Sequence, residues 1–171
     1  KLNKKDNFYA MPFMEFIGTD DLRRQALILA LARQESRFVP SAISTSYALG
    51  MMQFMPFVAN DIAKKQGLAE FDQDNMFKPE VAYKFANIHL DYLENYLISP
   101  VFIAYAYNGG IGFTNRMLKN GLFDKKGKYE PYLAMELVPY AESRDYAKKV
   151  LANFVIYAQI LGLKVSAEDE I

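Results

Sequence analysis

The stretch LILALARQESRF, residues 27–38, decides how the rest of this chain is interpreted. Its first six residues are all apolar, so a helix through them has no side that faces solvent as an ordinary surface helix does. Thr19-Asp20-Asp21 supplies N-capping side chains before it, and the sequence predicts a buried helix that runs to about Ser36. Glu35 lies at the end of this helix, where a carboxylate is unfavourable unless it has a partner or a chemical role.

Glu35 is therefore the first candidate for acid–base chemistry. Apolar surroundings and the negative end of the helix dipole both disfavour the carboxylate, so we expect a raised pKa for Glu35. A glutamic acid that stays protonated near neutral pH can act as a general acid. A structural alternative remains open from position alone, in which Glu35 forms an ion pair with Arg33, Arg37 or Arg144.

The composition excludes several classes of protein. With 171 residues, of which 51% are hydrophobic, the chain can bury one sizeable core. Its 20 basic and 20 acidic residues cancel and its basic clusters are short, so we expect no nucleic-acid partner. The absence of cysteine and the single histidine, His89, argue against a disulfide, a cofactor bound through cysteine or a histidine-rich metal site. No apolar run approaches the ~20 residues of a transmembrane helix.

Apolar spacing of three and four residues predicts an all-α fold. After residue 36 we expect a loop over 37–46, and proline and glycine positions then delimit the helices. The expected helices are 56–67, a third from Pro79, 101–107 with a buried stop at 108–110, 112–120, and 139–161. The apolar face of the third includes Tyr92 and Tyr96 and reaches Leu97. Residues 123–130 are expected to form a loop, and the acidic tail 165–171 to be frayed.

Three further motifs follow the helix that carries Glu35. They are Gly50-Met51-Met52-Gln53, Ala106-Tyr107-Asn108-Gly109-Gly110, and the segment from Glu136-Leu137-Val138-Pro139 to Tyr146. Together with Gln34-Glu35-Ser36, and in this order and spacing, they resemble the catalytic domain of the soluble lytic transglycosylases, which cleave bacterial peptidoglycan. The resemblance implies a lysozyme-like, goose-type helical fold of two lobes, with a cleft between the lobe around 41–67 and the later helices.

The resemblance also assigns roles to residues of this chain. Glu35 takes the role of the single catalytic acid and base. Ser44 matches a serine near the acetamido-assisted intermediate, Gln53 a glutamine that contacts sugar, and Met52 and Met55 methionines beside the cleavage site.

The second half of the chain supplies the remaining roles. The resemblance implies that the Tyr107 hydroxyl steadies the catalytic carboxyl, that Asn108 shapes the cleft and that Glu142 lines it. The chain departs from the family pattern at Met51, at Gly109, at Ser143 and at Tyr47, where glycine is common; the last change concerns the shape of the substrate loop.

Acidic residues are absent between Ser36 and Asn60. A two-carboxylate glycosidase needs a second acid roughly 5–10 Å from the first, which Glu136 or Glu142 could supply from far along the chain. A single-acid mechanism is simpler, in which the substrate's own acetamido group assists the departure of the leaving group. A lysozyme-type hydrolase that uses water and a non-catalytic peptidoglycan-binding domain remain alternatives.

Sugar rings present apolar faces on which tyrosines can stack. The chain has no tryptophan, so we expect Tyr47, Tyr105, Tyr140 and Tyr146 to serve this purpose. The expected partner is the glycan strand of peptidoglycan and the expected location the periplasm or bacterial cell envelope. We expect a monomer with no metal and no cofactor, in which residues 1–171 form one catalytic domain with an entry segment, 1–18. The start at Lys1 further suggests the C-terminal part of a longer protein.

Overall fold

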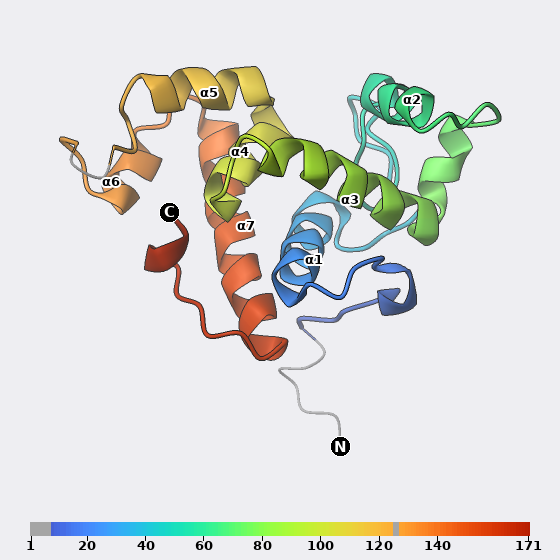
Figure 1. The fold of residues 1–171 in the computed structure, drawn as a ribbon, viewed down its shortest axis with the longest axis horizontal. Coiled ribbons are helices and arrows are strands. Elements are labelled where there is room, and N and C mark those ends of the chain that lie inside the picture. Colours follow the sequence, from blue (N-terminus) through green and yellow to red (C-terminus); the bar gives the residue numbers. More distant parts are fainter. Residues whose placement is uncertain (1–7, 125–126) are drawn as a thin grey trace. The chain divides into compact units, whose positions relative to one another are not determined.

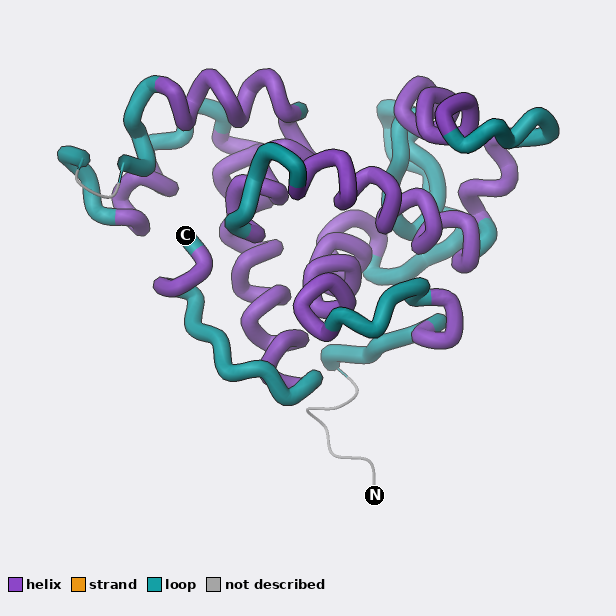
Figure 2. The backbone as a smooth tube through the Cα atoms, viewed as in Figure 1, coloured by secondary structure: helices purple, strands orange, loops and turns teal. Residues whose placement is uncertain are grey.

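The computed structural model describes residues 8–124 and 127–171, and within these ranges all regular secondary structure is helical (Figures 1 and 2). This confirms the predicted all-α class. The chain divides into two compact units, with the boundary after His89. In chain order the elements are η1 (Met14–Phe16), α1 (Leu22–Ser36), α2 (Pro56–Lys65), η2 (Gln73–Phe77), α3 (Pro79–Glu94), α4 (Pro100–Gly109), α5 (Ile111–Lys119), α6 (Pro131–Glu136), α7 (Ala141–Ile160) and η3 (Glu168–Glu170).

Helix α1 is the buried helix that the opening stretch predicts. Asp21 caps it, since its Oδ1 accepts a hydrogen bond from the backbone N–H of Arg23 at 2.9 Å. Every residue from Gln25 to Ala32 is buried. The helix ends at Arg37, whose left-handed φ of 56° turns the chain away immediately after Glu35 and Ser36.

Residues 37–55 form an irregular segment that folds back on itself. Isolated antiparallel bridges join Ile43 to Leu49 and Leu49 to Phe54. Gly50 packs against the first unit's η2, because a Cβ added to it would lie 2.0 Å from the carbonyl oxygen of Met76. The glycine of the Gly50–Gln53 motif is therefore required by a close backbone approach.

Helices α2 and α3 begin at Pro56 and Pro79, as the proline positions predict. Helix α3 ends at Glu94, earlier than expected. Of the apolar face predicted for it, Leu97 is buried, whereas Tyr92 and Tyr96 are exposed. The two tyrosine rings pack edge to face at 5.5 Å on the surface, so they are not part of the core as their spacing indicated.

In the second unit, α4 packs along α7 (Figure 1). Ser99 caps α4 by accepting a hydrogen bond from the Val101 N–H at 3.1 Å. The predicted stop at 108–110 needs correction. Helix α4 includes Asn108 and Gly109, and Gly110 with φ 86° separates it from α5; Gly109 and Gly110 are exposed, because this turn lies at the surface.

Two features of the second unit were missed by the sequence analysis. Helix α6 begins at Pro131 behind a Glu130 cap, a start signal that the polar neighbouring loop obscured. The end of the chain is not frayed: η3 forms, Glu170 is 6% exposed, and Ser99 Oγ donates a hydrogen bond to its carbonyl oxygen at 2.5 Å. A backbone contact and burial thus hold this acidic tail in place.

Among the described residues, no helix combines the length and apolar character that crossing a membrane requires.

Candidate functional site

Glu35 is half-buried on the last turn of α1. The next residue, Ser36, fixes this helix end: its Oγ donates a hydrogen bond to the Met51 carbonyl at 2.8 Å and accepts one from the Val39 N–H at 3.1 Å. Two of the motifs are therefore joined directly. The serine of Gln34-Glu35-Ser36 holds the Gly50–Gln53 segment against the turn that carries Glu35.

Two of the three arginines weighed as structural partners of Glu35 have other contacts. The Arg33 Nη1 donates a hydrogen bond to the Phe8 carbonyl at 2.6 Å, and its guanidinium lies 4.4 Å from the ring centre of Tyr9. Arg144 Nη1 donates to the carbonyls of Glu136 and Val138, within the second unit.

Gln53 adopts a left-handed φ of 52° and is half-buried. Its amide nitrogen donates hydrogen bonds to the Gly50 carbonyl at 2.8 Å and the Ala42 carbonyl at 3.3 Å. These bonds orient the side-chain amide and stabilise the loop. The Gln53 side chain therefore has a structural role in the loop, in addition to the contact with sugar that is expected of it.

The two methionines expected to contact substrate differ in burial. Met52 is fully buried and belongs to the core of the first unit, whereas Met55 is half-buried at the N-cap of α2. Of the two, only Met55 is accessible to a ligand in this structure. The burial of Met52 argues against the expectation that it lies in the substrate groove.

Ser44 organises the turn 44–47 through its side chain. Its Oγ accepts hydrogen bonds from the N–H groups of Ser46 at 3.2 Å and Ala48 at 3.0 Å. The backbone closes the same turn, because the Tyr47 N–H donates to the Ser44 carbonyl at 3.0 Å.

In the second unit, Asn108 and Glu142 lie on the wall of one hollow of about 520 Å³. Asn108 on α4 is fixed by α7, because its Oδ1 accepts a hydrogen bond from the buried Ser143 Oγ at 2.7 Å. Glu142 is exposed in the first turn of α7, where the helix dipole favours a carboxylate. Tyr107, also from the Ala106–Gly110 motif, is half-buried on α4.

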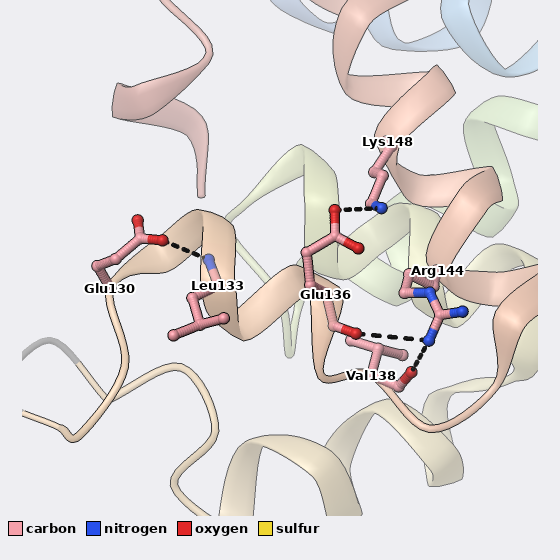
Figure 3. A network of polar contacts seen from close by, with 6 residues as sticks. All are labelled: Glu130, Leu133, Glu136, Val138, Arg144 and Lys148. Carbon is pink, nitrogen blue, oxygen red and sulfur yellow. Dashed lines mark hydrogen bonds and ion pairs between the residues drawn. The ribbon is translucent and has the colours of Figure 1, made fainter.

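Glu136, the other acid considered for a hydrolase, has a structural partner. Its Oε1 lies 2.5 Å from Nζ of Lys148, and Arg144 ties the backbone after α6 to α7 (Figure 3). The hydrogen bond from Lys148 holds the pKa of Glu136 below its ordinary value. A carboxylate with a lowered pKa is a weaker general base, which disfavours the two-acid alternative through this residue.

The four tyrosines expected to stack on sugars separate into two pairs. Tyr105 and Tyr146 are buried, so the prediction that they stack on sugars is wrong. Burial also raises the pKa of Tyr105. Tyr47 and Tyr140 are exposed, and Tyr140 lines the hollow that contains Asn108 and Glu142.

Sequence analysis did not single out three residues that shape these regions. Ser36 appeared only as the last residue of Gln34-Glu35-Ser36, and Ser143 only as a departure from the family pattern. Arg116, which lines the same hollow as Asn108, lies in the last turn of α5 and carried no motif signal. Among the described residues, no group of His, Cys, Asp and Glu side chains is placed to hold a metal ion.

The model of the transglycosylase SLT domain family matches residues 18–130. The chain belongs to this family. The match includes α1, the loop 37–55 and the Ala106–Gly110 motif.

Individual relatives of this SLT-domain chain are named as lytic murein transglycosylases. It is 30% identical over 142 residues to the soluble lytic murein transglycosylases of Salmonella typhimurium and Escherichia coli K12, covering 82% of this chain and 21% of each relative. It is 34% identical over 146 residues to the membrane-bound lytic murein transglycosylase C of Photorhabdus laumondii, covering 74% of this chain and 40% of that protein. The chain thus spans about a fifth of the soluble relatives' length.

Solved structures show the same fold. The 70 kDa soluble lytic transglycosylase of Escherichia coli is 27% identical and superposes with a TM-score of 0.73, covering 89% of this chain and 26% of that one. The lytic transglycosylase Slt of Pseudomonas aeruginosa, solved as an inactive glutamate-to-glutamine mutant, gives a TM-score of 0.72 at 27% identity, covering 84% and 23%. The Escherichia coli enzyme has also been solved in complex with bulgecin A.

Proposed function

We propose that this SLT-domain chain is a peptidoglycan lytic transglycosylase. It cleaves the β-1,4 bond between N-acetylmuramic acid and N-acetylglucosamine and leaves a 1,6-anhydromuramoyl end. The observation that carries the proposal is the position of Glu35, on a helix end that Ser36 fastens to the Gly50–Gln53 segment by the 2.8 Å bond to Met51. Between Leu22 and Asn60 the sequence contains no Asp or Glu other than Glu35.

Glu35 acts in both steps of the proposed reaction. As a carboxylic acid it donates its proton to the leaving glycosidic oxygen while the C1–O bond breaks, and the 2-acetamido oxygen bonds to C1. As a carboxylate it then takes the proton of the muramoyl 6-hydroxyl, whose oxygen attacks C1 and displaces the acetamido oxygen. The proton returns to Glu35, so the enzyme is restored and no water is consumed.

The other residues bind the substrate in this proposal. In the first unit, Ser44, Gln53 and Met55 contact the sugars around the cleaved bond, and Met52 supports them from the core. In the second unit Tyr107, Asn108 and Glu142 contact the strand, and the hydrogen bond from Ser143 to Asn108 supports this assignment because it fixes the amide. Residues 1–171 are proposed to make one catalytic domain.

The setting of the enzyme is also part of the proposal. The relatives are named as murein transglycosylases, both soluble and membrane-bound. These names support our proposal that the chain acts on glycan strands in the periplasm, within the bacterial cell envelope. We propose that it does so as a monomer.

Mass spectrometry of the muropeptides released from purified sacculi tests this function. The proposed enzyme releases anhydromuropeptides, each one water lighter than the corresponding reducing product. Reducing muropeptides alone would instead identify a hydrolase. Sacculi that bind the protein but release nothing soluble would identify a binding domain.

A further inference from the structure

Tyr47 occupies the last position of the turn 44–47 in a conformation that suits glycine. Its φ is 64°, and the turn places it directly after the residues that reverse the chain. This turn connects two residues that pair across an antiparallel bridge. Glycine commonly fills the last position of such a turn, because a side chain is unfavourable in the left-handed region of φ and ψ. Here Ile43 and Leu49 form that bridged pair.

The side chain of Tyr47 is 73% exposed. The other non-glycine residues with positive φ in the described part of the chain have a visible structural reason for it. Phe38 is buried, Gln53 forms two side-chain hydrogen bonds, Arg37 ends α1, and Phe13 is half-buried before η1. Tyr47 has neither burial nor a helix end to offset its backbone conformation.

Backbone strain together with an exposed aromatic ring indicates a functional role, because a residue in a strained conformation does not contribute to stability there. A tyrosine ring offers an apolar face and a hydroxyl at its edge, which match the alternating C–H and O–H groups of a pyranose. Tyr47 also belongs to the turn that Ser44 organises, so it lies within the segment that the proposed function assigns to substrate.

We propose that Tyr47 is a sugar-stacking platform that binds one N-acetylated pyranose of the glycan strand and takes no part in the chemistry. The inference rests on the proposed function and deepens it. Tyr47 is a specificity-determining residue in this scheme: it strengthens the binding of long strands, and the proton transfers of Glu35 proceed without it.

Kinetics of Tyr47→Gly on soluble glycan strands separate binding from chemistry. Glycine relieves the backbone strain and removes the ring, so this variant is expected to melt at a higher temperature than the parent and yet show a KM about 2- to 12-fold higher with kcat unchanged, the factor that corresponds to an aromatic contact of ~0.5–1.5 kcal/mol. Tyr47→Phe keeps the ring and should stay close to the parent. Tyr96→Ala, which removes an exposed tyrosine outside the loop 37–55, is the matched control and should leave KM unchanged.

A direct readout of stacking is available because the chain contains no tryptophan. Tyr47→Trp creates a single indole at the proposed platform. In a Glu35→Gln background, its emission should change saturably as purified glycan strands are added, and binding should be at least as tight as that of Glu35→Gln alone.

The outcomes divide cleanly. An unchanged KM in Tyr47→Gly, or an indole emission that glycan does not alter, overturns the platform and leaves the lytic activity standing. If the parent chain releases no anhydromuropeptides, the proposed activity fails, and glycan binding by the Tyr47→Gly and parent proteins then decides the platform alone: weaker binding by Tyr47→Gly supports it and equal binding overturns it.

Discussion

Replacing Gly50 with alanine should destabilise the protein far more than the same change at another left-handed glycine. Gly50 has a φ of +74°, and a Cβ at this position would lie 2.0 Å from the Met76 carbonyl oxygen and 3.0 Å from its carbonyl carbon. The atoms in the way belong to the backbone of η2 and not to a flexible side chain, so the loop or the η2 segment must move.

Two effects add in the Gly50→Ala variant. The left-handed conformation costs about 1–2 kcal/mol with a Cβ, and relieving an overlap inside a packed region costs about 1–3 kcal/mol. The expected loss in the free energy of unfolding is thus about 2–5 kcal/mol. Gly67 provides the control, because its φ is +66° and nothing lies within 4 Å of an added Cβ; Gly67→Ala should lose only the conformational part.

Urea unfolding of the two variants and the parent, monitored by circular dichroism, measures the difference. The reasoning predicts that Gly50→Ala is about 1–3 kcal/mol less stable than Gly67→Ala, since the change in the unfolded chain is the same for both. Equal losses at the two positions would refute the close approach between Gly50 and Met76. Because Ser36 bonds to Met51, Gly50→Ala should also lower activity at temperatures where it remains folded.

Three further outcomes are expected. Burial, with a smaller contribution from Lys65, lowers the pKa of His89 from 6.5 to about 4. The unfolded chain therefore binds this proton more readily than the folded one, and the free energy of unfolding should fall as the pH drops from 6.5 towards 4. Thermal melts of His89→Gln should lack this part of the decline. Lys148 lowers the pKa of Glu136, so their pair stabilises the fold fully above the ordinary carboxyl pKa and less as the pH falls through the lowered pKa of Glu136. The difference in melting temperature between the parent and Glu136→Gln should therefore shrink on acidification. A constant difference would contradict this role of the pair. Ser99→Ala should cost about 1–2 kcal/mol as a lost helix cap and release the tail near Glu170, seen as faster amide exchange there, whereas unchanged exchange would show that the tail is held without Ser99.

Helix boundaries set by backbone chemistry could be predicted closely. Pro56, Pro79 and Asp21 begin helices where their side chains predict them to, because a fixed φ or a capping carboxylate acts locally. The buried character of α1 was equally clear from its uninterrupted apolar run. These features depend on neighbours in sequence and need no knowledge of tertiary packing.

Features that depend on tertiary contacts were less predictable. Tyr92 belongs to the apolar face predicted for its helix yet is exposed, whereas Tyr105, which was expected to stack on sugar, is buried. The acidic end of the chain looked disordered by composition, whereas a contact with Ser99, far away in sequence, orders it. Spacing identifies an amphipathic face but not which residues of that face become buried.

The same division holds in the candidate site. The motifs identified Glu35, Asn108 and Glu142 as functional candidates, and the structure places the last two on one hollow. The link from Ser36 to Met51 could not be read from the sequence, because a serine hydroxyl has many potential acceptors. Met52, by contrast, matched a motif position but is fully buried, since its neighbours in the first unit enclose it.

The role of Glu35 as the single acid and base is tested most directly by the activity of Glu35→Gln on purified sacculi, with Glu136→Gln as the matched carboxyl-to-amide control. The measurement is the rate at which anhydromuropeptides are released, at equal concentrations of folded protein and at a temperature below the melting transition of each variant. The single-acid mechanism predicts a loss of about 10²- to 10⁴-fold for Glu35→Gln and little change for Glu136→Gln. Release by Glu35→Gln at more than a few per cent of the parent rate, or an equal loss in Glu136→Gln, would contradict it.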